Sequence, residues 1–173
     1  MDSQQHLFSD PDISFLAQAK LQARVLVPVL RAIRERIGRE EADKLVADAL
    51  RDWSREQFEQ VASASQDTKL GHWQTIWGDV FKKIDEGFEM EVLQEDDATQ
   101  DFNVTHCPYA DYFQALDEPE LGALLLCEQD VHLADSVGSD AVEFNRSQTI
   151  MGGAKFCDFR IRLHNKAPKS DKA

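Results

Sequence analysis

The sequence lacks the features that define several large classes of protein. It has 19 Lys and Arg against 32 Asp and Glu in 173 residues, a net charge of −13, so it lacks the basic surface that nucleic-acid binding requires. Its longest apolar run, Leu121 to Cys127, falls far short of the roughly 18 residues that cross a bilayer. The first twelve residues are polar and acidic, so no secretory signal is visible. We therefore expect a cytoplasmic protein with no nucleic acid and no membrane as partner.

Cysteine is also scarce. The three cysteines are an odd number and cannot all pair within the chain, and without an export signal we expect them to be reduced. No C-x-x-C pair occurs, so the spacing gives no support to a zinc knuckle. The sequence also has no H-E-x-x-H motif, no phosphate-binding glycine loop and no G-x-S-x-G elbow. We expect no cofactor, although three cysteines with a histidine remain a zinc set by residue type.

What the chain does have is enough apolar content, 42%, to bury the core of one domain. Its first half has apolar residues at helical spacing, with Gly38 and Gly87 as helix ends. Ser9-Asp10-Pro11 is typical of a helix start, and Pro28 predicts a kink because proline removes a backbone donor. The predicted helices cover residues 12–37, 39–63 and 68–86.

From Phe88 onward the apolar residues alternate instead. Residues 88–106 predict a β-hairpin with one solvated face, and residues 142–163 predict a second hairpin that turns at Gly152-Gly153. In the second hairpin, alternation continues from Val142 to Ile150, which predicts a strand of that length. Two short helices, residues 108–116 and 119–135, separate the hairpins.

These elements predict an α+β fold in which N-terminal helices pack with a small antiparallel sheet of two β-hairpins separated by a helix pair. We expect a single domain over residues 1–173. It consists of a helical part (1–87), an α+β part that carries the site (88–163) and a frayed polar tail (164–173). The helices of residues 12–86 carry more apolar surface than one small sheet needs, which favours a homodimer through them.

Cys107 is the first candidate for chemistry. Pro108 suits the first position of a helix, which makes Cys107 the predicted cap residue. A thiolate there would face unpaired N–H groups and the positive end of the helix dipole, which lower the pKa of a cysteine and make it a nucleophile. His106 precedes it and is a candidate base, although adjacent residues of an extended segment point to opposite sides. The alternative is a small buried cysteine at a strand-to-helix corner.

Cys127 and Asp130 are three residues apart on a predicted helix and therefore share a face. If Asp130 is partly buried, its pKa rises and it can act as a general acid or base. The alternative is an ordinary solvated carboxylate at the edge of an apolar stripe.

Cys157, Asp158 and Arg160 lie on a predicted strand, where Cys157 faces the core and the other two face the opposite side. The pattern fits a core cysteine beside a structural ion pair. It also fits a dipole that orients a small charged ligand, since Arg binds carboxylates in a bidentate fork.

Five segments, in this order, resemble the L-2-amino-thiazoline-4-carboxylic acid hydrolase family, small bacterial proteins with a variable helical N-terminal part. The resemblance is close over residues 107–160 and general in layout before them. The segments are Cys107-Pro108-Tyr109-Ala110, Glu118-Pro119-Glu120-Leu121-Gly122, Cys127-Glu128-Gln129-Asp130, Arg146 to Gly153, and Cys157-Asp158-Phe159-Arg160.

The resemblance implies a C–N hydrolase that opens a cyclic isothiourea amino acid to a carbamoyl-cysteine. Such a reaction needs a nucleophile or an activated water, an acid for the leaving nitrogen, and a cation for the substrate carboxylate. Under this hypothesis Cys107, Cys127 and Asp130 are catalytic, and the substrate is bound by His106, Arg146, Cys157, Asp158 and Arg160. The alternatives are a non-catalytic small-molecule-binding domain of the same fold and a zinc site formed by the three cysteines.

Overall fold

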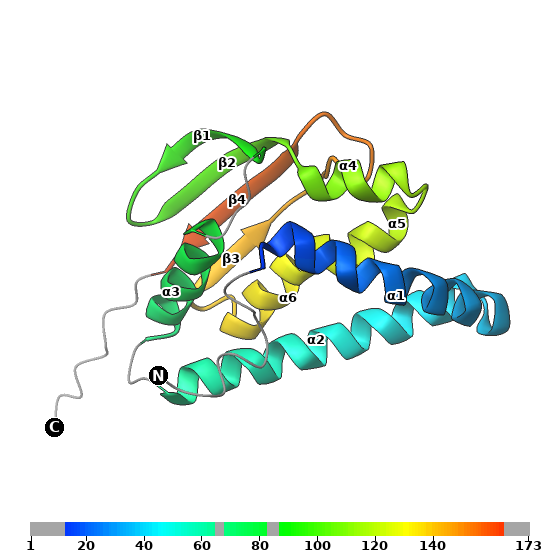
Figure 1. Ribbon diagram of the computed structural model, residues 1–173. Helices are drawn as coiled ribbons and strands as arrows, with labels where there is room; N and C mark the ends of the chain where they lie inside the picture. Colours follow the sequence, from blue (N-terminus) through cyan, green and yellow to red (C-terminus); the bar gives the residue numbers. More distant parts are fainter. Residues whose placement is uncertain (1–12, 65–67, 83–86, 165–173) are drawn as a thin grey trace, which may run out of the picture.

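The computed structural model describes residues 13–64, 68–82 and 87–164 and has the α+β fold that the sequence predicts. Four strands form one antiparallel sheet in the order β1-β2-β4-β3, and the helices lie against it and beneath it (Figure 1). The helices are α1 (Phe15–Ile37), α2 (Arg39–Ala64), α3 (Lys69–Lys82), α4 (Pro108–Ala115), α5 (Pro119–Gly122) and α6 (Glu128–Val137), with a π-helical segment, Ala123–Cys127, between α5 and α6. The strands are β1 (Glu89–Glu95), β2 (Thr99–His106), β3 (Val142–Asn145) and β4 (Cys157–Leu163).

The first helix begins later than its sequence signal. α1 starts at Phe15, and the side chain of Ser14 caps it by accepting a hydrogen bond from the N–H of Ala17 at 3.2 Å. The predicted start at Ser9-Asp10-Pro11 lies outside the described residues, as does the predicted frayed tail beyond His164. α1 continues through Pro28 to Ile37, and Gly38 ends the helix with a φ of 87°. None of the helices in the described residues is long and apolar enough to cross a membrane.

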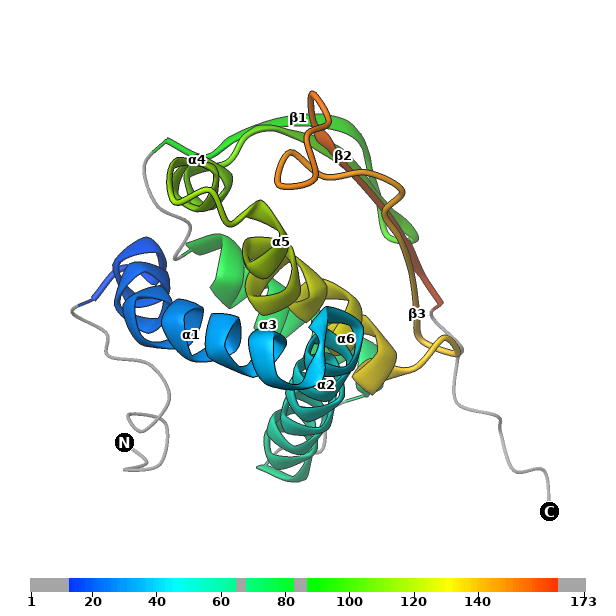
Figure 2. The same cartoon turned by 90° about the vertical axis from the view of Figure 1, so that its right-hand side faces the viewer.

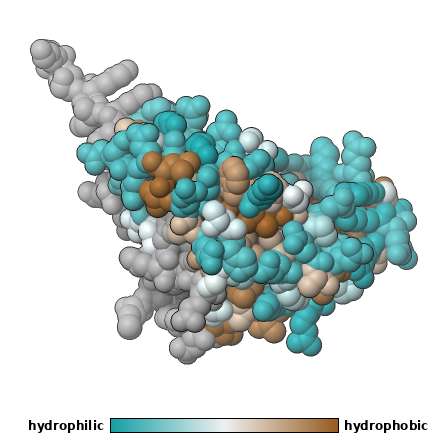
Figure 3. Space-filling model, turned by 90° about the horizontal axis from the view of Figure 1, so that it is seen from above, coloured by the Kyte–Doolittle hydropathy of each residue, from teal (hydrophilic) through white to brown (hydrophobic). Residues whose placement is uncertain are grey.

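The sheet corrects two details of the prediction. β3 ends at Asn145, so the strand predicted to continue to Ile150 is too long, and residues 146–156 form a loop instead. All seven residues of β1 are exposed, so the expected buried face of this strand is wrong. Figure 3, which views the molecule from above, shows a brown hydrophobic patch within teal surface on the side where β1 lies. β2 and β4, by contrast, alternate buried and less buried residues as the sequence predicts.

The helix predicted over residues 119–135 is one helical stretch with an irregular middle. The π-helical turn at Ala123–Cys127 lies within an apolar run that has no helical period to predict it. Gly122 precedes this turn and packs closely, because a Cβ there would meet the side chains of Met151 and Phe113 at 2.6 Å. No larger residue fits at this position without displacing them.

Two hydrophobic clusters make up the core. The sheet cluster joins α3, α6 and the inner faces of β2 and β4, and contains Trp73, Trp77, Phe102 and Phe159. The helix cluster joins α1, α4 and the α5 region. Figure 2 shows the same two layers from the side, with the sheet curving over the helices. Cys107 and Ile150 pack against both clusters, so the junction lies where the sequence places its candidate site.

Candidate functional site

Each of the three cysteines lies at an end of a helix or strand near the junction of the two hydrophobic clusters. Cys107 caps α4, Cys127 ends the π-helical turn, and Cys157 begins β4. All three are free thiols, and each lies close enough to the other two for their charges to affect one another's pKa. The predicted cap position of Cys107 is therefore correct.

The loop of residues 146–156 holds this junction together from both sides. The backbone N–H of Ile150 donates to the Sγ of Cys157 at 3.2 Å, and the side chain of Gln114 on α4 donates to the carbonyl of Ile150 at 3.0 Å. Met151 packs into the space that Gly122 leaves open. The loop is therefore tied to β4 on one side and to α4 and α5 on the other.

Arg146 begins this loop and reaches back to the α6 region. Its guanidinium donates to the carboxylate of Asp130 at 2.7 Å and to the carbonyl of Cys127 at 2.6 Å. The same group lies over the rings of Phe144 and Phe159, 5.7 and 5.2 Å from their centroids. The side chain of Arg146 is only 7% exposed, so this is a cation held inside the protein by one carboxylate, one carbonyl and two aromatic faces.

Asp130 is the acidic partner of this buried cation. Burial raises the pKa of Asp130, and the charge and hydrogen bond of Arg146 offset only part of that rise. Its side chain keeps 30% of its surface exposed, so the residue is not sealed from solvent. A carboxyl group with these properties is suited to proton transfer.

The thiols are less reactive than the sequence predicts. Burial raises the pKa of Cys107, and the N–H groups of Ala110 and Tyr109 at the start of α4 oppose this rise without cancelling it. The predicted lowering of the Cys107 pKa is therefore wrong, because two hydrophobic clusters pack around the cap residue. Burial also raises the pKa of Cys157, and it raises that of Cys127 to about 12. At neutral pH all three side chains are protonated thiols.

Asp158 lies on β4 next to Cys157 but has a different role. Its carboxylate accepts hydrogen bonds from the N–H of Ser147 at 3.0 Å, the hydroxyl of Ser147 at 2.6 Å and the N–H of Gln148 at 2.8 Å. Burial by itself raises the pKa of Asp158, but these hydrogen bonds outweigh it and hold the pKa below its usual range. Asp158 thus fixes the two residues that follow Arg146.

Arg160 and His106 lie apart from the thiols. Arg160 donates to the carbonyl of Phe102 and to the side chain of Asn103, both at 3.0 Å, instead of to Asp158. The ring of His106 hydrogen-bonds the carbonyl of Gly87 and, at 2.8 Å, the carboxylate of Asp111, and these contacts raise its pKa. The structure therefore brings Cys107, Cys127, Cys157, Asp130 and Arg146 together and directs Asp158, Arg160 and His106 to structural contacts.

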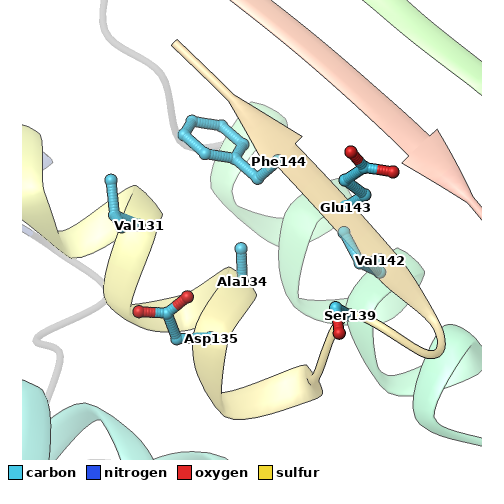
Figure 4. Close-up of a pocket in the computed structure, with 7 residues that line it drawn as sticks. All are labelled: Val131, Ala134, Asp135, Ser139, Val142, Glu143 and Phe144. Carbon is cyan, nitrogen blue, oxygen red and sulfur yellow. The ribbon is translucent and has the colours of Figure 1, made fainter.

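A small cavity of about 140 Å³ lies between α6 and β3 (Figure 4), and neither Asp130 nor Arg146 lines it. Val131, the residue after Asp130, and Phe144, whose ring contacts Arg146, line it from opposite sides. Figure 4 shows the ring of Phe144 directed toward α6, whereas the carboxylates of Asp135 and Glu143 point away from each other. Phe144 therefore contacts both this cavity and Arg146.

A zinc site would need at least three ligand side chains grouped around one point. Within residues 13–64, 68–82 and 87–164, no group of three His, Cys, Asp or Glu side chains is placed to hold a metal ion. The three thiols are neighbours, but they do not form a ligand set.

Several residues of the site have no signal of their own in the sequence. Ser147, Gln148 and Gln114 are ordinary polar residues, and their role arises only when the loop is folded against β4 and α4. The family-like segment from Arg146 to Gly153 marks the loop as a whole, which is as close as the sequence comes to them.

The family model of L-2-amino-thiazoline-4-carboxylic acid hydrolases matches residues 18–161 of the chain. No curated protein is significantly similar to it. Among solved structures, the phenol-responsive sensory domain of the transcription activator PoxR, crystallised with phenol, is 12% identical. Its TM-score is 0.48, and the match covers 84% of this chain and 73% of that one. The SO2144 H-NOX domain from Shewanella oneidensis, solved by NMR in the Fe(II)CO state, is 13% identical with a TM-score of 0.35, covering 83% and 78%.

Proposed function

The chain belongs to the L-2-amino-thiazoline-4-carboxylic acid hydrolase family, and we propose that it opens a cyclic isothiourea amino acid of this type at the Asp130–Arg146 pair. The observation that carries the proposal is the pair itself: a carboxylate and a guanidinium at 2.7 Å, largely withdrawn from water and adjoined by three protonated thiols. The substrate class has the complementary charges, since it contains a basic amidine-like group and a carboxylate.

Charge complementarity gives the two residues separate tasks. The amidine N–H groups of the substrate would donate to Asp130, and the substrate carboxylate would be attracted to Arg146. A substrate bound in this way has each of its charged groups next to the residue of opposite charge, and the two contacts together fix its orientation. A small ring would approach the pair on the side where Asp130 keeps 30% of its side-chain surface exposed.

The reaction consumes one water. Asp130 takes a proton as water adds to the carbon between sulfur and the two nitrogens, giving a tetrahedral intermediate. Cleavage of the bond to the ring nitrogen, with return of the proton to that nitrogen, gives S-carbamoyl-cysteine. Cleavage of the bond to sulfur gives the N-carbamoyl isomer. Neither route needs a thiolate, which agrees with the raised pKa of all three cysteines.

The test is incubation of the purified protein with L-2-amino-thiazoline-4-carboxylate, followed by mass spectrometry for a product one water heavier. We expect turnover by wild type and by Asp52→Asn, a control that removes an exposed carboxylate on α2. We expect no measurable turnover by Asp130→Asn. Binding of the substrate by wild type without any turnover would overturn the hydrolase and favour the non-catalytic small-molecule-binding domain.

A further inference from the structure

α1 is apolar on two opposite faces. One face packs into the core through Ala19, Ala23, Val27 and Leu30, all of which are buried. A helix that covers a core on one side ordinarily presents polar and charged residues on the other. The outer face of α1 departs from this rule.

The outer face carries an uninterrupted apolar seam. Leu21 is 52% exposed, Val25 is 64% exposed and Val29 is 48% exposed, and Pro28 and Ala32 lie exposed between and after them. The positions Leu21, Val25, Pro28 and Ala32 follow one another at spacings of four, three and four residues. That alternation is the spacing at which one helix packs along another.

We propose that this seam, defined as residues Leu21, Val25, Pro28, Val29 and Ala32, binds the same seam of a second copy of the chain, with the two α1 helices antiparallel. Figure 2 shows α1 at the left edge of the helices, on the side away from β3, where a second helix can reach it. The middle of the seam is made of Val, Pro and Ala, whose small side chains allow the two helices to approach closely.

The charges beside the seam select the antiparallel arrangement. At 3.6 residues per turn, Arg24, Arg31 and Glu35 lie on the same flank of the seam, and all three are exposed. Arg31 already pairs with Glu118 of its own chain, which leaves Arg24 and Glu35 as the charges of this flank that can meet a second copy. In an antiparallel pair the same flanks of the two helices face each other. A two-fold axis near Val29 then brings Arg24 of one copy toward Glu35 of the other, and the same contact forms twice. The other flank carries Gln18, Gln22 and Arg36, which place no like charges opposite each other at this register.

The other exposed apolar surface is a weaker candidate for self-association. On β1, Met90, Val92 and Leu93 are 40–60% exposed, but the charged residues of that strand are Glu89, Glu91 and Glu95. Two copies of β1 side by side would bring carboxylates together with no basic residue between them, which is unfavourable. The seam of α1 has both the apolar contact and the opposite charges.

The first test is the mass of the full chain in solution, measured by sedimentation or light scattering over a range of concentrations. We expect wild type to reach twice the chain mass of 19.6 kDa. Val25→Glu is expected to weaken the dimer at least tenfold. Val92→Glu, a matched control at a similarly exposed valine on β1 (60%), is expected to leave it unchanged.

The second test uses the charge pair and does not depend on the apolar variant folding. Arg24→Glu and Glu35→Arg should each weaken self-association, because each places two like charges opposite each other. Mixing the two single variants should restore the dimer, because only the mixed pair has opposite charges at both contacts. A wild type that stays at 19.6 kDa at its highest soluble concentration, a dimer that Val25→Glu leaves intact, or a mixture that does not associate would each overturn the proposal.

Discussion

Asp130 and Asp158 flank the same loop and have opposite properties. Asp130, on the α6 side, has its pKa raised by burial and is bonded to one cation, Arg146. Asp158, on the β4 side, accepts three hydrogen bonds from the loop and has its pKa held below the usual range. Asp130 therefore contacts Arg146 itself, whereas Asp158 contacts the two residues that follow it. Only Asp130 has a pKa that is moved toward neutral pH.

This difference in pKa distinguishes a residue suited to proton transfer from a residue that holds the loop in place. A carboxylate whose environment raises its pKa can exchange a proton during a reaction, whereas one fully satisfied by hydrogen bonds stays ionised and holds its partners in place. Asp158 is a positioning residue, because it fixes Ser147 and Gln148 and thereby the start of the loop that carries Arg146. The predictions below challenge this division of roles.

The largest effect is expected from Asp130→Asn. Removing the carboxylate removes the general base, which ordinarily contributes about 10²–10⁴-fold to a rate. We expect turnover of the thiazoline acid to fall by at least the lower figure at a temperature where the variant is folded. The melting temperature should also fall, because the buried Arg146 loses its counter-charge even though Asn can still accept a hydrogen bond from it. Steady-state kinetics and a melting curve check both. Unchanged turnover would remove Asp130 from the mechanism.

The pH dependence should separate the two carboxylates in wild type. Asp130 acts as a base only when ionised, so activity rises with pH through its raised pKa and falls roughly tenfold per unit below it. Asp158, with its lowered folded pKa, contributes stability that is present above its unfolded pKa and is lost as pH falls through the folded value. Activity should therefore be lost at a higher pH than folding, as measured by initial rates and circular dichroism. Coincident losses would contradict the division of roles.

Arg146→Met tests the buried cation. It leaves Asp130 without its partner, which costs about 2 kcal/mol of unfolding free energy, less than for a fully buried pair because the Asp130 side chain is 30% exposed. Urea unfolding measures this loss. The control is Arg55→Met, which breaks the exposed Arg55–Asp52 pair on α2 and should cost under about 1 kcal/mol. Equal losses in the two variants would mean that Arg146 is an ordinary surface charge.

Asp158→Asn should act through the loop. Losing the charge on three hydrogen bonds costs about 1–2 kcal/mol, and a less constrained Arg146 should raise KM more than it lowers kcat. A merely structural role would lower stability and leave the KM of the properly folded protein unchanged.

The smallest effect is expected from Cys107→Ser. Since burial raises the pKa of this thiol, its replacement should change the rate by less than about threefold if water is the nucleophile. Alkylation of Cys107 in the native protein should also be slower than that of free cysteine. Rapid alkylation at mildly acidic pH would restore it as a nucleophile.

Periodicity predicted the parts of the fold that depend on local pattern. The helices, the first hairpin, and Cys107 as the cap of α4 follow from residues close in sequence. β3 was predicted too long because alternation continues past Asn145. The chain leaves the sheet there, and Arg146 finds its partner on α6, a contact that no local pattern encodes.

The properties of the site depend on packing between distant segments. The sequence places Cys127 with Asp130 and makes Arg146 a candidate. For Cys107 it predicts a lowered pKa, because the sequence shows only the start of the helix that this residue caps. The two hydrophobic clusters that meet at Cys107 reverse that direction. Asp158 and Arg160 share a face of β4 as predicted, but they do not bind each other. Asp158 accepts hydrogen bonds from the loop, and Arg160 donates to Asn103 on β2.

The most direct measurement compares Asp130→Asn with Cys107→Ser for hydrolysis of L-2-amino-thiazoline-4-carboxylate under identical conditions, with mass spectrometry of the product. If Asp130 activates water, Asp130→Asn loses turnover and Cys107→Ser retains it. Loss of turnover in Cys107→Ser with activity retained in Asp130→Asn would contradict the account.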